Sequence, residues 1–208
     1  MPNFLIIDDH PIVRKGIRQL LEERSGPVSV EEAGSAAEGV KKFREGDYEL
    51  VLLDINLPGR GGLDLIEDLK KIKSNVRVLV VSMYPEEQYA IRALKSGAMG
   101  YLTKDSAPDE LLVAVNKILQ GDRYITQSIA EKIFDALENK GVPHEALSNR
   151  EFEVMILIAR GRNLKTIGDL LSLSEKTIST YRSRILEKMN MQSNADIIKY
   201  ALQNKLIE

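Results

Sequence analysis

Three carboxylates and a lysine stand directly after short apolar runs, where their side chains could act together. They are Asp8, Asp9, Asp54 and Lys104, and the runs before them are Phe4–Ile7, Leu50–Leu53 and Gly100–Thr103. Such runs are typical of strands that are buried on both faces of a parallel sheet. Parallel sheets bind ligands at the carboxyl ends of their strands, so these four side chains converge if the three strands are neighbours.

Grouped in this way, the residues suit phosphoryl transfer. Three carboxylates in one pocket repel one another and favour a hard divalent cation such as Mg²⁺. A lysine ammonium opposite them supplies a point charge for a phosphoryl group. The Asp54 carboxylate could then act as the covalent nucleophile, while the metal and the lysine stabilise the transferring charge. Taken alone, Asp54 is equally well interpreted as a turn residue at a strand end.

The elements that must position these residues alternate between strand-like and helix-like segments. The predicted strands are Phe4–Ile7, Val28–Ala33, Leu50–Leu53, Val76–Val81 and Gly100–Thr103. Helical patterns follow each strand, and Ser35 with Glu38 predicts a capping box at the start of one helix. Right-handed crossovers between parallel strands then give an α/β fold, a doubly wound five-stranded sheet.

The second half of the chain has an all-helical pattern. Residues 123–146 are interpreted as a partly helical linker, and residues 147–208 as a small domain of four helices. Ser148 with Glu151 predicts a capping box for the first of these helices. The short helix 164–171, a tight turn and a helix capped by Ser174 indicate a helix-turn-helix. A fragment of a four-helix bundle is the competing interpretation.

The helix after Ser174 has a face that suits the DNA major groove. Ile178, Ile185 and Met189 share one side and should pack inward, which leaves a small, polar face poor in acids on the other. Thr177 near the helix start could take a phosphate. The candidate DNA contacts are Lys176, Thr177, Ser179, Thr180, Arg182, Ser183, Arg184 and Lys188.

Composition excludes several classes of protein. The chain has no cysteine and two histidines far apart, which argues against disulfides, thiolate metal sites and a histidine-rich metal site. No apolar run approaches the roughly 18 residues of a membrane span, and no signal peptide is visible, so we expect a cytoplasmic protein without membrane contact. Residues 1–122 carry a small acidic excess and residues 147–208 a small basic excess, which allows DNA binding by the second half.

The first part of the sequence resembles a known family. Asp8 and Asp9, Asp54, Ser82 and Lys104 stand where receiver domains of two-component response regulators carry the acidic pair, phospho-acceptor, switch hydroxyl and lysine. This resemblance covers residues 1–122, which implies a flavodoxin-like receiver with strand order 2-1-3-4-5.

Residues 147–208 resemble the DNA-binding domain of the LuxR/NarL/FixJ class. The whole chain is similar to NarL/FixJ-type response regulators, and residues 177–184 look most like the BvgA-type branch. Many members carry basic residues where this chain has Ser179 and Ser183, and a histidine where it has Tyr181. Tyr181 is therefore interpreted as a packed residue whose hydroxyl contacts a phosphate, and not as a residue that reads bases.

The resemblance implies a regulator rather than an enzyme. A sensor histidine kinase would phosphorylate Asp54, meeting the receiver near Val13, Gly16 and Ile17. Phosphorylation would move Ser82, let the Tyr101 ring rotate inward, and yield a homodimer that binds double-stranded promoter DNA. The implied Mg²⁺ ligands are Asp9, Asp54 and the backbone carbonyl of Asn56, with Asp8 in the outer shell.

Two other functions remain open from the sequence. A phosphotransferase or phosphatase of the haloacid-dehalogenase type would need a second aspartate two residues after the nucleophile, where this chain has Asn56. The other alternative is a phosphorylation-independent regulator whose acceptor site is vestigial, or an adaptor that does not bind DNA.

Overall fold

The structure is a computed structural model that describes residues 2–24, 27–59, 61–138 and 142–207. The chain divides into two compact units, Met1–Ile133 and Phe134–Glu208. Within the described residues, no helix is both long and apolar enough to cross a membrane.

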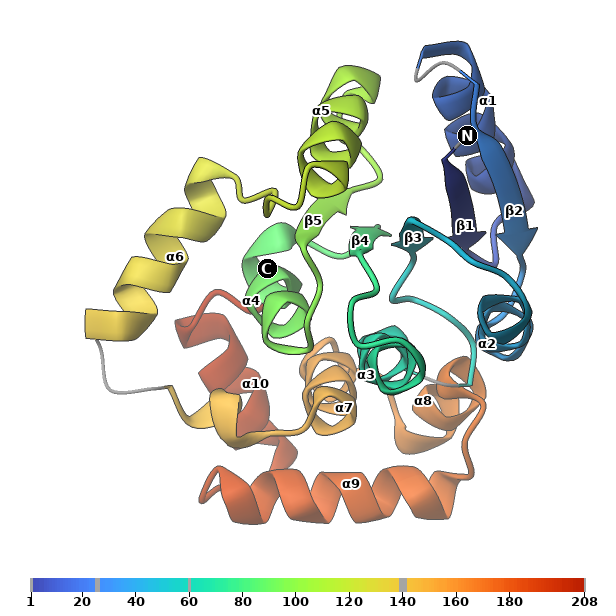
Figure 1. The fold of residues 1–208 in the computed structure, drawn as a ribbon. Coiled ribbons are helices and arrows are strands. Elements are labelled where there is room, and N and C mark those ends of the chain that lie inside the picture. Colours follow the sequence, from blue (N-terminus) through green and yellow to red (C-terminus); the bar gives the residue numbers. More distant parts are fainter. Residues whose placement is uncertain (1, 25–26, 60, 139–141, 208) are drawn as a thin grey trace. The chain divides into compact units, whose positions relative to one another are not determined.

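The first unit is built on a five-stranded parallel sheet with the order β2-β1-β3-β4-β5 (Figure 1). Its strands are β1 (Asn3–Ile7), β2 (Ser29–Ala33), β3 (Leu50–Leu53), β4 (Val78–Ser82) and β5 (Gly100–Thr103). The predicted doubly wound α/β fold and its strand order are confirmed. The β4 strand begins two residues later and ends one residue later than predicted. Its last residue, Ser82, still pairs with Thr103 of β5.

Helices cover both faces of this sheet. They are α1 (Pro11–Arg24), α2 (Ala36–Glu45), α3 (Gly62–Ile72), α4 (Glu86–Lys95) and α5 (Pro108–Leu119). The α1 and α5 helices cover one face, and α2, α3 and α4 cover the other (Figure 1). Alternate strand residues such as Phe4, Leu52 and Leu79 are buried against Leu21 and Ile118 on the α1 and α5 side.

The start of α2 differs in one contact from the prediction. The Ser35 side chain accepts the backbone N–H of Glu38, as a cap should. The Glu38 carboxylate, however, accepts the N–H of Gly34 instead of that of Ser35. The capping box predicted here is therefore wrong, since the glutamate reaches one residue further back.

Within the described residues, the regular elements of the second half of the chain are all helices. Its elements are α6 (Gln127–Glu138), the 3₁₀ helix η1 (Pro143–Ala146), α7 (Asn149–Ala159), α8 (Leu164–Leu171), α9 (Glu175–Lys188) and α10 (Asn194–Gln203). The capping box of Ser148 and Glu151 is present at α7, and Ser174 caps α9. The boundary between the two units falls inside α6.

A tight turn joins α8 to α9. Ser172 ends α8 in the left-handed conformation with φ of 53°. Gly168 allows the turn to close on α8, because a Cβ at this position would lie 2.7 Å from the backbone oxygen of Leu173. The predicted pair of short helices with a tight connection is therefore present in the second unit.

Candidate functional site

The backbone places Asp8, Asp54 and Lys104 at one edge of the sheet. Hydrogen bonding continues one residue past the strand ends: the N–H of Asp54 donates to Ile7 O and that of Lys104 to Ser82 O, both at 2.8 Å. These residues therefore leave the carboxyl ends of neighbouring strands together, which is where open parallel sheets bind ligands.

The Lys104 ammonium lies between two carboxylates. Its Nζ is 2.6 Å from Asp54 Oδ2 and 2.7 Å from Asp8 Oδ2. All three side chains are buried, with exposed fractions of 5% for Lys104, 0% for Asp54 and 3% for Asp8. The structure thus brings together three of the residues that the sequence analysis grouped.

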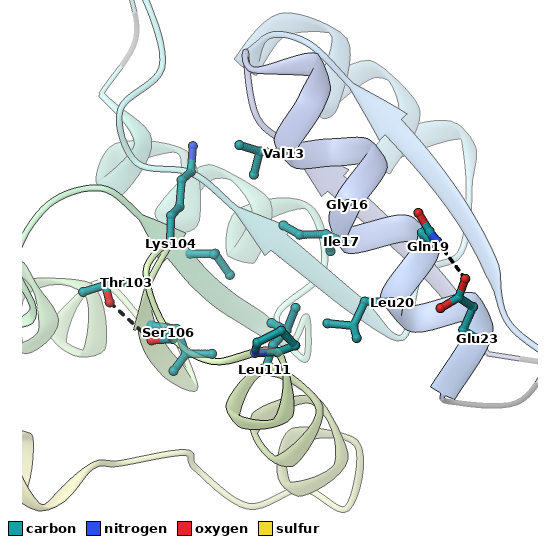
Figure 2. A pocket seen from close by; sticks show the side chains of 13 residues that line it. Val13, Gly16, Ile17, Gln19, Leu20, Glu23, Thr103, Lys104, Ser106 and Leu111 are labelled. Carbon is teal, nitrogen blue, oxygen red and sulfur yellow. Dashed lines mark hydrogen bonds between the residues drawn. The ribbon is translucent and has the colours of Figure 1, made fainter.

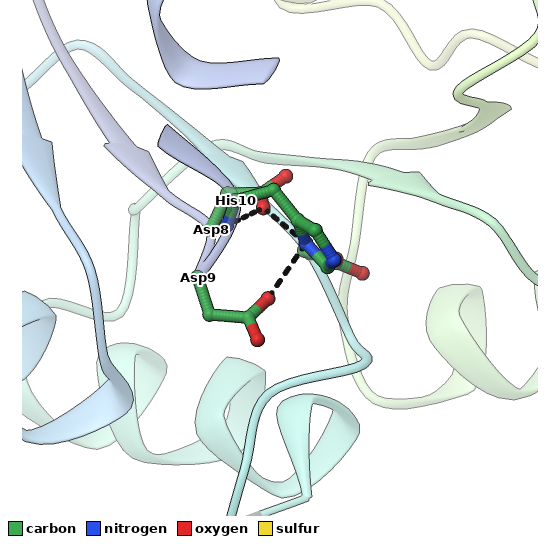
Figure 3. Close-up of side chains that lie close together, drawn as sticks. Asp8, Asp9 and His10 are labelled. Atoms are coloured by element: carbon green, nitrogen blue, oxygen red, sulfur yellow. Dashed lines mark hydrogen bonds and ion pairs between the residues drawn. The ribbon is translucent and has the colours of Figure 1, made fainter. Parts of the chain in front are cut away.

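Asp9 and His10 complete this cluster (Figure 3). The His10 Nδ1 atom lies 3.1 Å from Asp8 Oδ1 and 2.8 Å from Asp9 Oδ1. One ligand atom each from Asp8, Asp9, His10 and Asp54 lies within 4.8 Å of the others. His10 was not predicted from the sequence, although its position directly after the acidic pair was a signal that could have identified it.

The electrostatics of the pocket favour a cation. Burial raises the pKa of Asp54 even though hydrogen bonds from Lys104 and Asn56 oppose the shift. For Lys104, burial lowers the pKa, but the carboxylates of Asp54 and Asp8 outweigh it and the net shift is upward. Lys104 is therefore a protonated ammonium, and it pairs with two of the three carboxylates, those of Asp8 and Asp54. The remaining negative charge is what a divalent cation would neutralise.

Tyr84, in the loop between β4 and α4, contacts the rim of this pocket. The Asn56 N–H donates to Asp54 Oδ1 at 2.8 Å, and the Tyr84 hydroxyl donates to Asn56 Oδ1 at 2.9 Å. The Tyr84 N–H donates to Ser82 Oγ at 3.3 Å. Tyr84 was not predicted from the sequence, because its contact with Asn56 joins residues far apart in the chain.

Tyr101 is fully buried, and its hydroxyl donates to the backbone oxygen of Tyr84 at 2.8 Å. The ring already points inward, which is the orientation that the resemblance associates with phosphorylation. An inward rotation of Tyr101 would have to start from a conformation other than this one.

A cavity of about 450 Å³ lies beside Lys104, between α1 and the β5–α5 segment (Figure 2). Its walls are mostly apolar and include Val13, Gly16 and Ile17 of α1, the residues suggested for kinase contact. Leu102 and Leu111 line it from the opposite side.

The α9 helix presents the polar face expected of a groove-reading helix. Lys176, Ser179, Thr180, Ser183 and Arg184 are exposed. The first four of these residues line a hollow shared with Glu175 and with Leu164 of α8. The hydroxyls of Thr180 and Ser183 donate to backbone oxygens one turn earlier in α9, so each can still accept a hydrogen bond from DNA.

Three other predicted DNA contacts are already engaged within the second unit. Arg182 Nε donates to Asn194 Oδ1 at 2.6 Å, and Lys188 Nζ lies 2.6 Å from the buried Glu151 carboxylate. The Thr177 N–H donates to the Ser174 cap at 3.1 Å. Tyr181 is half-buried. A phosphate would therefore compete with internal partners at Arg182, Lys188 and Thr177.

Comparisons with known proteins agree with this arrangement of two sites. Residues 4–116 match the response regulator receiver domain, and residues 145–201 match the bacterial regulatory proteins of the luxR family. The chain belongs to the two-component response regulators with a LuxR-type DNA-binding domain. It is accordingly a transcription regulator, and this family is not enzymatic. The BvgA-type branch stays a prediction.

Proteins that match over nearly the whole chain are also response regulators. The response regulator UvrY of Escherichia coli strain K12 is 32% identical over 99% of this chain and 96% of its own length. The response regulator GacA of Pseudomonas viridiflava is 34% identical over 100% of this chain and 99% of its own.

Among solved structures, RcsB from Salmonella enterica serovar Typhimurium bound to promoter rprA with the phosphomimetic BeF3⁻ has a TM-score of 0.67. It is 27% identical and covers 96% of this chain and 98% of its own.

Proposed function

We propose that a sensor histidine kinase phosphorylates Asp54 and that this modification controls dimerisation and sequence-specific DNA binding. The observation that carries the proposal is the burial of Asp54 with its Oδ2 2.6 Å from Lys104 Nζ. In the reaction, the P–N bond of a phosphohistidine breaks and a P–O bond to an Asp54 oxygen forms. Lys104 and the Ser82 hydroxyl would then bind the new phosphoryl oxygens.

Magnesium fits this pocket. Asp9, Asp54 and the backbone carbonyl of Asn56 would hold the ion directly, and Asp8 would act from the outer shell. The cluster supports this assignment, because one ligand atom each from Asp8, Asp9, His10 and Asp54 lies within 4.8 Å of the others. When bound, the ion supplies positive charge that stabilises the transferring phosphoryl group. The protein holds the acceptor carboxylate and the lysine in place before transfer.

The contacts around Tyr84 offer a route from the pocket to the outer surface. Ser82 and Asn56 both contact Tyr84, and Tyr84 accepts from Tyr101. A Ser82 hydroxyl that turns towards a phosphoryl oxygen would lose its contact with the Tyr84 N–H. We therefore assign Ser82 and Tyr101 as the switch residues, and Tyr84 as the residue that links them.

The kinase is proposed to contact α1 and the cavity next to it. Ile12 at the start of α1 is 85% exposed, so its apolar side chain is available to a partner. Val13 and Ile17 line the cavity next to Lys104. A kinase helix placed here would bring its phosphohistidine close to the acceptor.

The DNA-binding half would act as a homodimer on promoter DNA. We assign residues 1–122 to the receiver, 123–146 to the linker and 147–208 to the DNA-binding domain. We also propose that the protein is cytoplasmic, where it can reach the chromosome. The RcsB structures support the proposal, since one contains two RcsB dimers bound to two parallel DNAs. Two copies of α9 would read half-sites about one helical turn apart.

One observation favours the alternative of phosphorylation-independent DNA binding. Tyr101 is buried in the inward orientation, so the switched arrangement of the receiver is accessible without a change at Tyr101. In that case the acceptor site would be vestigial.

A phosphoryl mimic separates these two functions. The full chain is measured by size-exclusion chromatography and gel shift, with and without beryllofluoride and Mg²⁺. The proposal expects dimers and tighter promoter binding with the mimic, and no response in Asp54→Asn. Equal DNA affinity under all conditions would support the alternative instead.

A further inference from the structure

We propose that residues 123–130, the first part of the linker, form a strap that a hydrogen bond from Thr126 to Glu86 holds on the receiver until Asp54 is phosphorylated. The inference rests on the proposed function and deepens it, because it identifies the contact through which the acceptor site would release the linker. All residues in the argument belong to the first compact unit, Met1–Ile133.

The strap follows α5 and passes beside β5, the edge strand of the sheet (Figure 1). Tyr124 forms a parallel β-bridge with Gly100, and its N–H donates to the Met99 oxygen at 2.9 Å. The approach is close, because a Cβ at Gly100 would lie 3.0 Å from the Tyr124 Cβ. The Tyr124 ring packs on the receiver core, with Lys117 Nζ 5.9 Å from the ring centroid. The first residues of the linker are therefore built into the receiver.

The Thr126 hydroxyl makes two hydrogen bonds. It accepts the Ile129 N–H at 3.2 Å, which caps the start of α6, and it donates to Glu86 Oε1 at 2.5 Å. A helix cap needs only the accepting role. The donated bond instead joins the strap to the first residue of α4. Because its acceptor is a carboxylate, this bond is stronger than one between neutral groups.

Glu86 lies two residues after Tyr84, whose N–H donates to the Ser82 hydroxyl. Pro85 between them fixes one backbone torsion, so the connection is short and stiff. If the Ser82 hydroxyl turns to a phosphoryl oxygen, the Tyr84 N–H loses its acceptor, and a shift of Tyr84 carries the Glu86 carboxylate with it. A displacement of about 1 Å is enough to break the bond to Thr126, because O–H···O bonds span roughly 2.5–3.0 Å.

Release of the strap would lengthen the free connection between the two halves of the chain. The strap is the segment through which the receiver continues into the rest of α6 and the second unit. A longer free tether widens the range of positions that the two DNA-binding domains of a dimer can reach. The phosphorylated receiver would thereby let both domains occupy their half-sites.

NMR-detected hydrogen exchange of the full chain tests the strap at the amides of Tyr124 and Ile129. Glu86→Ala removes the acceptor but leaves Thr126 able to cap α6. Thr126→Asp keeps a capping oxygen and places a second carboxylate next to Glu86. The matched control is Glu110→Ala, which removes an exposed carboxylate from the first turn of α5 as Glu86→Ala removes one from the first turn of α4. Thermal unfolding of each variant verifies that it is folded.

The proposal expects both amides to exchange about tenfold faster in Glu86→Ala and in Thr126→Asp, the change that corresponds to a lost hydrogen bond to a charged group. Glu110→Ala should exchange like wild type. Beryllofluoride with Mg²⁺ should produce the same increase in wild type and no further increase in Glu86→Ala. Exchange at the rate of wild type in both folded variants would overturn the strap.

The strap and the proposed function fail in different ways, because a gel shift on the same samples reports the effect of the phosphoryl mimic on DNA binding. Tighter promoter binding by wild type with unchanged exchange at Tyr124 and Ile129 would overturn the strap alone. Faster exchange without a change in DNA binding would support the strap and contradict the proposed control of DNA binding. Beryllofluoride without effect on either measurement would overturn both.

Discussion

The Tyr101 hydroxyl donates a 2.8 Å hydrogen bond to the backbone oxygen of Tyr84, which links β5 to the loop between β4 and α4. Tyr84 in turn contacts Asn56 and Ser82 at the rim of the acidic pocket. We propose that a change at the acceptor site reaches the start of α4 through Tyr84. This route would let the buried Tyr101 respond to chemistry on another strand.

Removal of this hydrogen bond should loosen the β4–α4 loop. Tyr101→Phe leaves the Tyr84 carbonyl without its tyrosine donor, which should cost about 1 kcal/mol of unfolding free energy. Chemical denaturation gives this value, and hydrogen exchange at residues 83–86 should become faster. Tyr124→Phe is the control, because the Tyr124 hydroxyl has no hydrogen-bond partner among the described residues and its removal should change neither quantity. Equal exchange in both variants would exclude the link.

The charge of Asp54 should destabilise the receiver at neutral pH. Burial raises its folded-state pKa, so the penalty is complete above that pKa and disappears as the pH falls below the unfolded value of about 3.9. Asp54→Asn removes the penalty and leaves Asp8 to pair with Lys104. At pH 7, Asp54→Asn should have a higher thermal unfolding midpoint than wild type. Its free energy of unfolding should be larger by about 1 kcal/mol.

This gain should shrink as the pH is lowered, since wild-type Asp54 then becomes neutral as well. Asp122→Asn removes an exposed aspartate from the same unit and serves as the control. A variant less stable than wild type at pH 7 would show that the ion pair with Lys104 outweighs the cost of burial.

Glu151 should stabilise the second unit. Burial raises its pKa, but Lys188 and the Ser148 amide outweigh it and the net shift is downward. Its contribution is therefore complete above the unfolded-state pKa of about 4.3 and is lost as the pH falls through the lower folded-state pKa. Glu151→Gln should cost about 1 kcal/mol at pH 7 through the weakened cap and ion pair.

Denaturation at pH 7 and again below pH 4 checks this prediction, because the difference from wild type should vanish in acid. Glu187→Gln, on the exposed surface of α9, should be neutral at both values. A difference that persists in acid would point to packing instead of charge.

The main elements of the fold could be predicted from the sequence because they depend on local patterns. Apolar runs such as Leu50–Leu53 and the Ser148–Glu151 box specify strands and helix starts within a few residues. The order of the strands came from the resemblance, since periodicity does not determine which strands pair. The Ser35 box failed because the Glu38 carboxylate accepts from the amide of Gly34, one residue before the cap.

The candidate sites were harder to predict wherever a contact joins distant residues. The helical face of α9 predicts that Arg182 and Lys188 point outward, yet Asn194 and Glu151 bind them. Spacing within one helix contains no information about those partners. Tyr84 was missed for the same reason.

Arg184 should contribute to DNA binding without reading bases. It is exposed on α9, so Arg184→Ala should weaken binding to all sequences and lower the slope of log affinity against log salt by about one. Lys199→Ala removes the same charge from α10 and should leave the slope unchanged. Thr180→Ala should instead change the preference among operators. Equal losses on every DNA for Arg184→Ala and Thr180→Ala would contradict this assignment of the α9 face.

The most direct test of the account is phosphoryl labelling at Asp54. Wild-type protein and Asp54→Asn are incubated with acetyl phosphate and Mg²⁺, and intact mass spectrometry measures the incorporated phosphoryl groups. The account predicts one phosphoryl group on wild type, lost when Mg²⁺ is chelated, and none on Asp54→Asn. Undiminished labelling of Asp54→Asn would contradict it, because the acceptor would then lie elsewhere.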